Sequence, residues 1–237
     1  MRVRIATYNV HKCRGLDRRT SPERIAEVIR ELDADVIAIQ EVLDVRDHGP
    51  YDQARRIGEL LHEYRWCFGA NRELRGGAYG NMTLTRLPFG TCQNYDITWR
   101  KRERRGCLRT DIQVGESLLH IFNVHLGTSF VERRHQARKL LTDAVLKRAN
   151  LSGPRVVLGD FNEWTRGLAS RLMGTEFEAV KPRGRTYPGV LPVLHLDHFY
   201  YDKQLKVRSV KLHRSRTALV ASDHLPLVAE FECGWRS

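Results

Sequence analysis

Residues 107–125, CLRTDIQVGESLLHIFNVH, decide the fold class of this chain. They hold two strand-like runs, Cys107–Val114 and Leu118–Val124, with no helix between them. Three further strand-like runs come before them, at Tyr64–Phe68, Asn81–Leu87 and Tyr95–Thr98. Successive strands without intervening helices imply an antiparallel sheet, because such strands need only short connections.

The segments on either side alternate helices with strands. Val3–Val10 predicts a strand, and residues 20–23, with a cap candidate and Pro22 in the first turn, predict the start of a helix. The apolar run 36–39 predicts a buried strand that ends at Glu41. Further helices are expected at Tyr51–Leu61, Glu132–Ala149 and Gly167–Met173, and further strands at Arg155–Leu158, Leu194–Tyr200, Lys206–Leu212 and Leu227–Phe231. No linker interrupts the chain, so we expect one α+β domain over residues 1–237, with two packed sheets flanked by helices.

The composition favours an ordered, soluble protein with an anionic partner. Forty Lys and Arg against 28 Asp and Glu give a net charge of +12, so nucleic acid is the expected partner and an anionic membrane lipid the alternative. Nothing in the sequence indicates an obligate protein partner. Five scattered cysteines without a C-x-x-C pair indicate neither a zinc site nor a disulfide framework, so we expect reduced thiols. Because no signal-peptide-like apolar run is present, a cytoplasmic protein is expected.

Polar residues that can do chemistry follow five of the predicted strands. They are Asn9 with His11, Glu41, Asn123 with His125, Asp160 with Asn162, and Asp223 with His224. Each alone has a plain structural explanation, since Asp and Asn form turns and a lone His is usually structural. Their number and their common place at strand ends favour a shared site.

Taken in order, these segments resemble the endonuclease/exonuclease/phosphatase family, the superfamily of deoxyribonuclease I. The resemblance rests on TYNVH, IQEV, YGNMTLTR, FNVHLG, LGDFN, LDHFY and SDHLP, spread between Val3 and Phe231. It implies a four-layer, deoxyribonuclease I-like β-sandwich. It also implies a metal-dependent hydrolase of phosphate esters that uses Mg²⁺, for which Mn²⁺ can substitute.

The resemblance assigns the metal-binding and base roles. Glu41 is expected to ligate Mg²⁺, with Asn9 beside it and Asp223 closing the metal site. Asp160 is the expected base that takes a proton from the attacking water. Asn162 is expected to orient that water or to hold a phosphate oxygen, two residues along an extended segment.

The remaining roles concern the phosphate. Asp197 is expected to pair with His224 and keep its imidazole protonated. His125 would contact the scissile phosphate or act as general acid, and Asn81 would help to position a phosphate. His11 stands where abasic-site endonucleases carry Asp, which adds a candidate phosphate donor. Among the basic loop residues, Arg105, Arg214 and Arg216 are expected to bind flanking phosphates.

Three functions follow from these observations. The leading one is a Mg²⁺-dependent phosphodiesterase that acts on nucleic acid by single-step attack of water. The enzymatic alternative acts on phospholipid head groups, in a sphingomyelinase-like or cardiolipin-related way, or is a phosphoinositide-type phosphatase. From another class, the chain could be a non-catalytic module that binds nucleic acid or a membrane surface, although the intact set of carboxylate, Asn and His residues argues against it.

Overall fold

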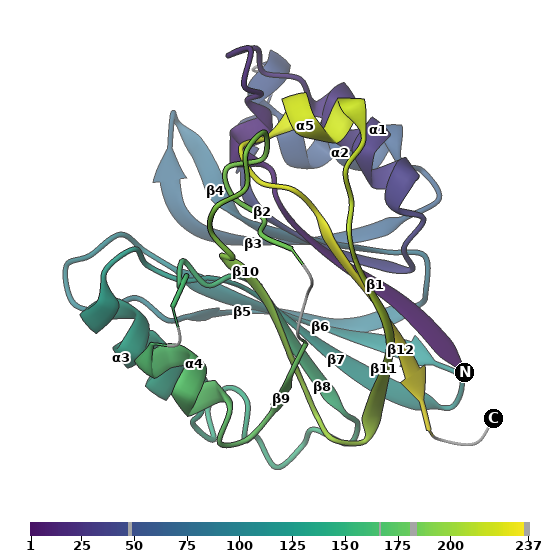
Figure 1. Ribbon diagram of the computed structural model, residues 1–237, viewed down its shortest axis with the longest axis vertical. Helices are drawn as coiled ribbons and strands as arrows, with labels where there is room; N and C mark the ends of the chain where they lie inside the picture. Colours follow the sequence, from purple (N-terminus) through teal and green to yellow (C-terminus); the bar gives the residue numbers. More distant parts are fainter. Residues whose placement is uncertain (47–48, 166, 181–183, 235–237) are drawn as a thin grey trace.

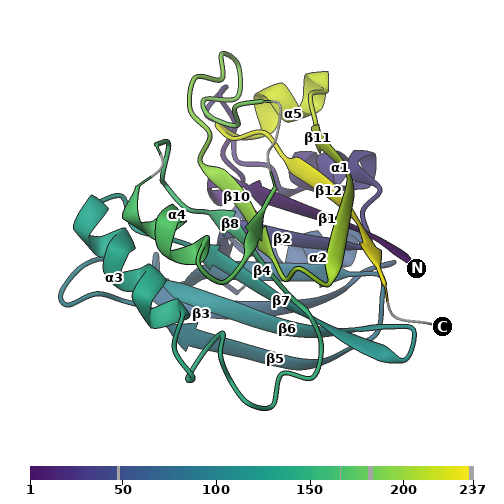
Figure 2. The same ribbon diagram turned by 60° about the horizontal axis from the view of Figure 1, so that its bottom comes forward.

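The structure, a computed structural model, describes residues 1–46, 49–165, 167–180 and 184–234 and forms four layers (Figure 1). Two six-stranded sheets pack face to face, and helices cover the outer face of each sheet (Figure 2). The expected two-sheet α+β sandwich with outer helices is therefore confirmed. None of the helices among these residues is both long and apolar enough to span a membrane.

The first sheet has the strand order β11-β12-β1-β2-β4-β3. Its strands are β1 (Arg2–Asn9), β2 (Val36–Asp44), β3 (Arg65–Leu74), β4 (Gly77–Thr85), β11 (Leu205–Leu212) and β12 (Leu227–Cys233). Its outer face is covered by α1 (Pro22–Leu32), α2 (Gln53–Leu60) and α5 (Arg216–Ala221). Two short 3-10 turns lie at η1 (His11–Cys13) and η2 (Gly49–Tyr51). As the capping sequence predicts, α1 begins after Ser21, whose side chain accepts a hydrogen bond from the Arg24 amide.

The second sheet has the order β5-β6-β7-β8-β10-β9. Its strands are β5 (Phe89–Asp96), β6 (Gly106–Val114), β7 (Ser117–His125), β8 (Arg155–Asp160), β9 (Glu178–Ala179) and β10 (Asp197–Tyr201), and its helices are α3 (Phe130–Leu140) and α4 (Leu168–Met173). The expected antiparallel run of strands is thus split, since β3 and β4 belong to one sheet and β5 to β7 to the other.

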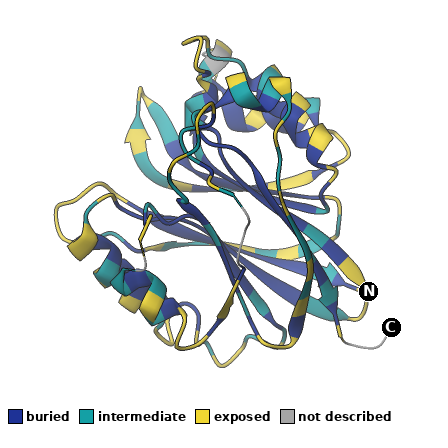
Figure 3. Cartoon of the chain, in the orientation of Figure 1, coloured by how far each residue is buried: buried dark blue, intermediate teal, exposed yellow. Residues whose placement is uncertain are grey.

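Strand periodicity directs side chains into separate cores, of which the three largest among the described residues lie between the layers. In β1, Ile5 faces the opposite sheet and packs in the core between the two sheets, whereas Tyr8 faces the helices of the first layer. Phe122 of β7 packs in a third core beneath α3 and α4. The central strands are accordingly buried on both faces over most of their length, whereas the edge strands β3, β5, β9 and β11 are partly exposed (Figure 3).

The predicted helix Glu132–Ala149 ends early, because α3 stops at Leu140. The Thr142 hydroxyl donates to the Lys139 carbonyl at 2.8 Å, a local hydrogen bond that competes with continued helix. Val145 and Leu146 nevertheless lie in the core beneath α3. The apolar periodicity of this segment therefore reports burial beyond the point where the helix ends.

The expectation that all thiols are reduced is wrong for one pair, Cys67 and Cys92, which form a disulfide. The bond joins β3 to β5, an edge strand of each sheet, with the two Cα atoms 6.1 Å apart. Their spacing in the sequence could not show that these edges meet. Since disulfides are typical of oxidising compartments, a cytoplasmic location stays a prediction.

A buried cluster in the second sheet anchors the start of the strand that carries Asp160. Arg109 donates to both carboxylate oxygens of Asp111, at 2.7 and 2.6 Å, and His120 Nδ1 lies 2.6 Å from the same carboxylate. The Gly153 amide donates to His120 Nε2 at 3.2 Å, so the ring proton is on Nδ1 and donates to Asp111. The cluster therefore ties the residues before β8 to β6 and β7.

We expect Asp111→Asn to lower the free energy of unfolding by about 3–5 kcal/mol at neutral pH, because it leaves a buried guanidinium without its charge partner. Burial alone would raise the pKa of Asp111, but hydrogen bonds from His120 and Arg109 lower it to about 2. A depressed pKa stabilises the folded state above the ordinary value of 3.8, and this stabilisation is lost as the pH falls through about 2. Denaturant unfolding should therefore show a parent–variant difference that shrinks between these two pH values, whereas a constant difference would contradict the pairing.

Candidate active site

The carboxyl ends of the central strands meet at the edge of the sandwich opposite the chain termini (Figure 1). In the two parallel pairs, Asn9 of β1 is in register with Gln40 of β2, and His125 of β7 with Asp160 of β8. A pocket of about 420 Å³ opens there. It is lined by Lys12, Glu41, Arg72, Tyr79, Glu103, Arg105, His125, Thr128, Asp160, Asn162, Trp164, Tyr187, Leu194, Leu196, Asp223 and His224. The pocket thus draws residues from both sheets.

Asn9 joins the two carboxylates at the floor of this pocket. Its Nδ2 donates to Glu41 Oε1 at 3.2 Å and to Asp160 Oδ2 at 2.9 Å. Glu41 Oε2 also accepts a hydrogen bond from Lys12 Nζ, at a distance of 2.5 Å. Burial alone would raise the pKa of Glu41, but nearby positive charge and the hydrogen bonds from Lys12 and Asn9 hold it well below its usual range. Glu41 is therefore an ionised carboxylate, but the prediction that its strand ends there is wrong, because β2 continues to Asp44 after an irregularity between Ile39 and Val42 at which Glu41 has a φ of 63°.

Asp160 lies at the centre of the site. Gly159 precedes it with φ of +140°, and a Cβ at this glycine would lie 1.9 Å from the Val124 carbonyl oxygen, so only glycine fits. The Asn162 amide donates to Asp160 Oδ1 at 2.8 Å. Asn162 adopts a left-handed conformation, with φ of 50°, instead of the extended one that the sequence suggests. Its Nδ2 donates to the Leu126 carbonyl at 2.9 Å, so this side chain also fixes the loop.

Two histidines flank Asp160 Oδ2, with Nε2 of His125 at 3.6 Å and Nε2 of His224 at 3.7 Å. The predicted pair of His224 with Asp197 is present, with Nδ1 2.9 Å from Asp197 Oδ2. Burial would lower the pKa of His224, but the carboxylates of Asp197 and Asp160 outweigh it and raise the pKa to about 10. The ring of Tyr187 packs against the imidazole at 4.9 Å between centroids. His224 is therefore held as an imidazolium aimed at Asp160.

His125 is the opposite case, a neutral imidazole. Arg105 Nη1 lies 2.9 Å from His125 Nδ1, and a guanidinium can only donate, so the ring proton is on Nε2. Burial and the Arg105 charge lower the pKa of His125 to about 4. Its Nε2–H can donate to a phosphate oxygen beside Asp160. Of the two roles expected from the sequence, the geometry favours contact with the phosphate over that of general acid.

Other predicted site residues lie at the margin of the pocket or outside it. Asn81 is buried between the sheets, where its Nδ2 donates to the carbonyls of Gly106 and Asn123 at 3.3 and 3.2 Å. His11 lies beside Asp223, with its Nδ1 3.7 Å from Oδ1 of that carboxylate. Asn81 therefore joins the two sheets beneath the site, and His11 borders the site through its side chain beside Asp223 and its backbone amide, which donates to Asn9 Oδ1 at 3.0 Å.

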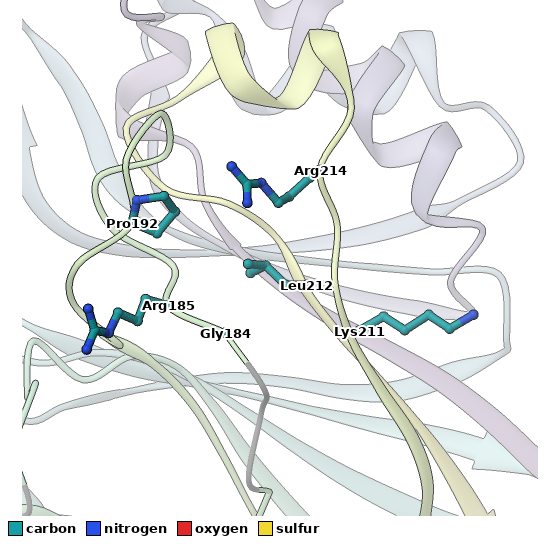
Figure 4. A pocket seen from close by; sticks show the side chains of 6 residues that line it. All are labelled: Gly184, Arg185, Pro192, Lys211, Leu212 and Arg214. Carbon is teal, nitrogen blue, oxygen red and sulfur yellow. The ribbon is translucent and has the colours of Figure 1, made fainter.

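The structure does not bring Arg214 and Arg216 into this pocket. Arg214 lines a separate hollow of about 660 Å³ with Gly184, Arg185, Pro192, Lys211 and Leu212. The basic side chains there point in different directions instead of converging on one point (Figure 4). Arg216 is the first residue of α5. Arg105, in contrast, is buried in the wall of the active-site pocket.

Sequence reasoning missed several pocket residues, among them Lys12, Arg72, Tyr79 and Glu103. Lys12 reaches Glu41 from a left-handed turn, in which His11, Lys12 and Cys13 have φ of 45°, 58° and 54°. The Lys12 carbonyl accepts a hydrogen bond of 2.6 Å from Gln53 Nε2, which holds the turn. Lys12 and Glu103 lie outside the regular strands, and Arg72 and Tyr79 lie on β3 and β4, so no local pattern in the sequence signals that they converge.

The donor set fits a magnesium ion. No group of three or more His, Cys, Asp or Glu side chains within the described parts of the chain forms a ready cage for a metal. Mg²⁺ does not require one, since it prefers oxygen ligands, keeps several waters and needs only one or two carboxylates. Glu41 supplies an ionised carboxylate that Lys12 pairs with, and Asp223 places a second side-chain carboxyl group on the pocket wall.

Comparisons with known proteins agree with this geometry. The model of the Endonuclease/Exonuclease/phosphatase family matches residues 6–224. Uncharacterized protein YbhP of Escherichia coli (strain K12) is 28% identical over 244 residues, covering 96% of this chain and 95% of that protein. The endonuclease/exonuclease/phosphatase from Bacteroides vulgatus has a TM-score of 0.81 at 18% identity, covering 98% of this chain and 99% of that one. Mannosyl-6-phosphatase Bt3783 of Bacteroides thetaiotaomicron VPI-5482 has a TM-score of 0.79 at 15% identity, covering 97% and 99%. At these identities the solved structures show a shared fold.

Proposed function

The chain belongs to the endonuclease/exonuclease/phosphatase family, whose members are hydrolases of phosphate esters, and on that premise we propose that it is a Mg²⁺-dependent phosphodiesterase acting on nucleic acid. The observation that carries the proposal is the surroundings of Asp160 Oδ2. Asn9 donates to this oxygen, and Nε2 of both His125 and His224 lies within 3.7 Å of it. A carboxylate that faces one neutral and one protonated imidazole suits a base that works beside a phosphate.

Each side chain has a part in the proposed hydrolysis. Asp160, whose carboxylate Asn9 orients, takes a proton from the water that attacks phosphorus, while the bond from phosphorus to the leaving oxygen breaks and that oxygen takes up a proton from solvent. The His224 imidazolium and the Nε2–H of His125 donate to phosphate oxygens, whose charge grows in the transition state. Glu41, Asn9 and Asp223 would hold the metal, which when bound would polarise the phosphate and offset its negative charge. Asp197 accepts a hydrogen bond from His224 Nδ1, which fixes the orientation of the imidazole and favours its protonated form.

The substrate class follows from charge. The chain carries a net charge of +12, and the loop between β5 and β6 includes Lys101, Arg102 and Arg104, all of which are exposed. The same loop ends in Glu103 and Arg105 at the pocket wall. A basic loop beside a phosphate site favours a polyanion with phosphates beyond the scissile one, as in DNA or RNA.

We expect DNA or RNA to bind an Asp160→Asn variant with an affinity that falls steeply with salt. Each neutralised phosphate releases condensed counterion and adds about 0.7–0.9 to the slope of log K against log salt. Neutralising Arg102 and Arg104 should flatten that slope, while neutralising Lys203 and Lys206, at the other end of β10, should not. Fluorescence anisotropy over a salt series measures both.

The same assay separates the phospholipid alternative. A flat salt dependence in the parent, together with tight binding to vesicles of anionic phospholipid, would contradict the nucleic-acid proposal and favour the lipid one. Neutralising Arg214 and Arg216 in this assay tests their sequence-predicted contact with flanking phosphates. Turnover of a small aryl phosphate should be unaffected by the Arg102 and Arg104 changes, because such a substrate does not reach the loop.

A further inference from the structure

Two arginines on the pocket wall share one glutamate. Arg72 Nη2 forms an ion pair with Glu103 Oε1 at 2.9 Å, and Arg105 Nη2 donates to Glu103 Oε2 at 3.0 Å. Arg72 belongs to β3 of the first sheet, whereas Glu103 and Arg105 lie just before β6 of the second. The three side chains therefore bridge the two sheets at the mouth of the active site, and we call them the arginine clasp.

The arginine clasp has donors to spare. The Nε atoms of Arg72 and Arg105 are both buried, and neither has a hydrogen-bond partner among the described residues. Arg105 is only 6% exposed, so water reaches its guanidinium poorly. A buried N–H without an acceptor costs about 1–3 kcal/mol, and more on a charged group. An anion bound at this wall of the pocket would offer acceptors for these two Nε–H groups.

The imidazole of His125 lies between the arginine clasp and Asp160. Arg105 Nη1 contacts His125 Nδ1 at 2.9 Å, and the other ring nitrogen of His125 lies 3.6 Å from Asp160 Oδ2. Arg72 is held in place by the Tyr79 ring, whose centroid is 4.7 Å from the guanidinium carbon. An anion on the clasp would therefore lie next to the phosphate that Asp160 and His125 face.

We infer that Arg72 and Arg105 form a second anion site, which takes the phosphate adjacent to the scissile one in a nucleic acid, and that Glu103 competes for it. This inference rests on the proposed function and specifies its substrate. Guanidinium groups bind the paired oxygens of carboxylates and phosphates alike, so the Glu103 carboxylate occupies donors that a phosphate can use. The Glu103 side chain is 37% exposed, and ion pairs this exposed contribute little, so it can be displaced into solvent.

Binding of dinucleotides to the Mg²⁺-supplemented Asp160→Asn protein tests the inference. Calorimetry would compare thymidylyl-thymidine with its forms phosphorylated at the 5′ or the 3′ end. We expect one phosphorylated form to bind about tenfold tighter than the parent dinucleotide, which corresponds to about 1.4 kcal/mol. Arg72→Met should remove this difference in affinity between the phosphorylated and the parent dinucleotide. Glu103→Gln should increase the difference, because a competing negative charge is lost.

Arg86→Met is the matched control, since Arg86 also stacks on a tyrosine, Tyr64, at 4.9 Å and pairs with a carboxylate, Asp33, but does not line the pocket. Arg86→Met should leave the tighter binding of the phosphorylated dinucleotide unchanged. Equal affinity for the three dinucleotides in the Asp160→Asn protein would overturn the inference. So would an Arg72→Met variant, folded by its thermal melt, that weakens all three equally, because Arg72 would then serve the scissile phosphate.

The source of the second phosphate is tested with a lipid-type probe. A larger gain from glycerol 3-phosphate to glycerol 1,3-bisphosphate than between the dinucleotides would assign the clasp to a lipid head group and overturn the nucleic-acid inference. Failure of the proposed function is seen separately, in the hydrolysis of bis(p-nitrophenyl) phosphate by the parent protein. That substrate carries one phosphate, so its turnover does not depend on a second anion site being present.

Discussion

Glu41→Gln should lower phosphodiesterase activity by at least about 10²-fold and abolish binding of Mn²⁺ or Mg²⁺. The expected loss exceeds the 10–100-fold cost that is usual for groups that only support a metal ligand, because Glu41 is the carboxylate placed to bind the ion directly. The substitution keeps the shape of the side chain and its hydrogen-bond acceptor toward Asn9. Activity assays and calorimetric metal titration measure the two effects.

The fold should survive this change, since Glu41 lies at the pocket surface and its partner Lys12 has a side chain that is 32% exposed. Thermal unfolding checks that point. Glu59→Gln serves as a control, because Glu59 is a half-exposed carboxylate of α2 that also pairs with basic side chains. Parent-like turnover with unchanged metal affinity in Glu41→Gln would show that Glu41 is not a metal ligand.

Asp160→Asn should cost about 10²–10⁴ in rate, the range expected for loss of a general base. Unlike Glu41→Gln, it should retain metal binding. Asn9 donates to Asp160 Oδ2 at 2.9 Å and the Asn162 backbone amide to Oδ1 at 2.8 Å, so asparagine, which has the same shape but one carbonyl oxygen, keeps one of these two hydrogen bonds. Rates measured at saturating Mg²⁺, beside the metal affinity of the same protein, isolate the proton transfer.

The two variants therefore dissect the site. If Asp160→Asn keeps its activity over the whole pH range, another group takes the proton from water. If it loses metal affinity together with activity, Asp160 belongs to the metal site instead. Asp143→Asn, an exposed position beyond α3, should change neither quantity.

The sequence predicted those site residues that follow buried strands. Glu41 and Asp160 each come at the end of an apolar run, and parallel pairing brings such ends to one edge. The pair of Asp197 with His224 was also predicted, from the family resemblance, and is present at 2.9 Å. Asp160 is the last residue of β8 as expected, whereas β2 continues past Glu41 to Asp44, so the apolar run located this carboxylate but not the end of its strand.

Residues on turns and loops could not be placed in the same way. Lys12 reaches Glu41 because three successive residues adopt left-handed backbone, and no local pattern announces that conformation. Glu103 and Arg72 meet across two sheets, as do Cys67 and Cys92. Contacts between edge strands depend on how the sheets pack, which the period of each strand does not specify. The arginine clasp and the disulfide therefore required the three-dimensional structure.

Hydrolysis of bis(p-nitrophenyl) phosphate by the purified protein, with Mg²⁺ and with EDTA, tests the central claim most directly. The released nitrophenolate is followed by its absorbance. We expect turnover that requires Mg²⁺, stops on addition of EDTA, resumes with excess Mg²⁺ or Mn²⁺, and is lost in Glu41→Gln. Absence of turnover with either metal would contradict the claim and favour a non-catalytic binding module, and turnover that EDTA leaves unchanged would contradict the metal-dependent mechanism.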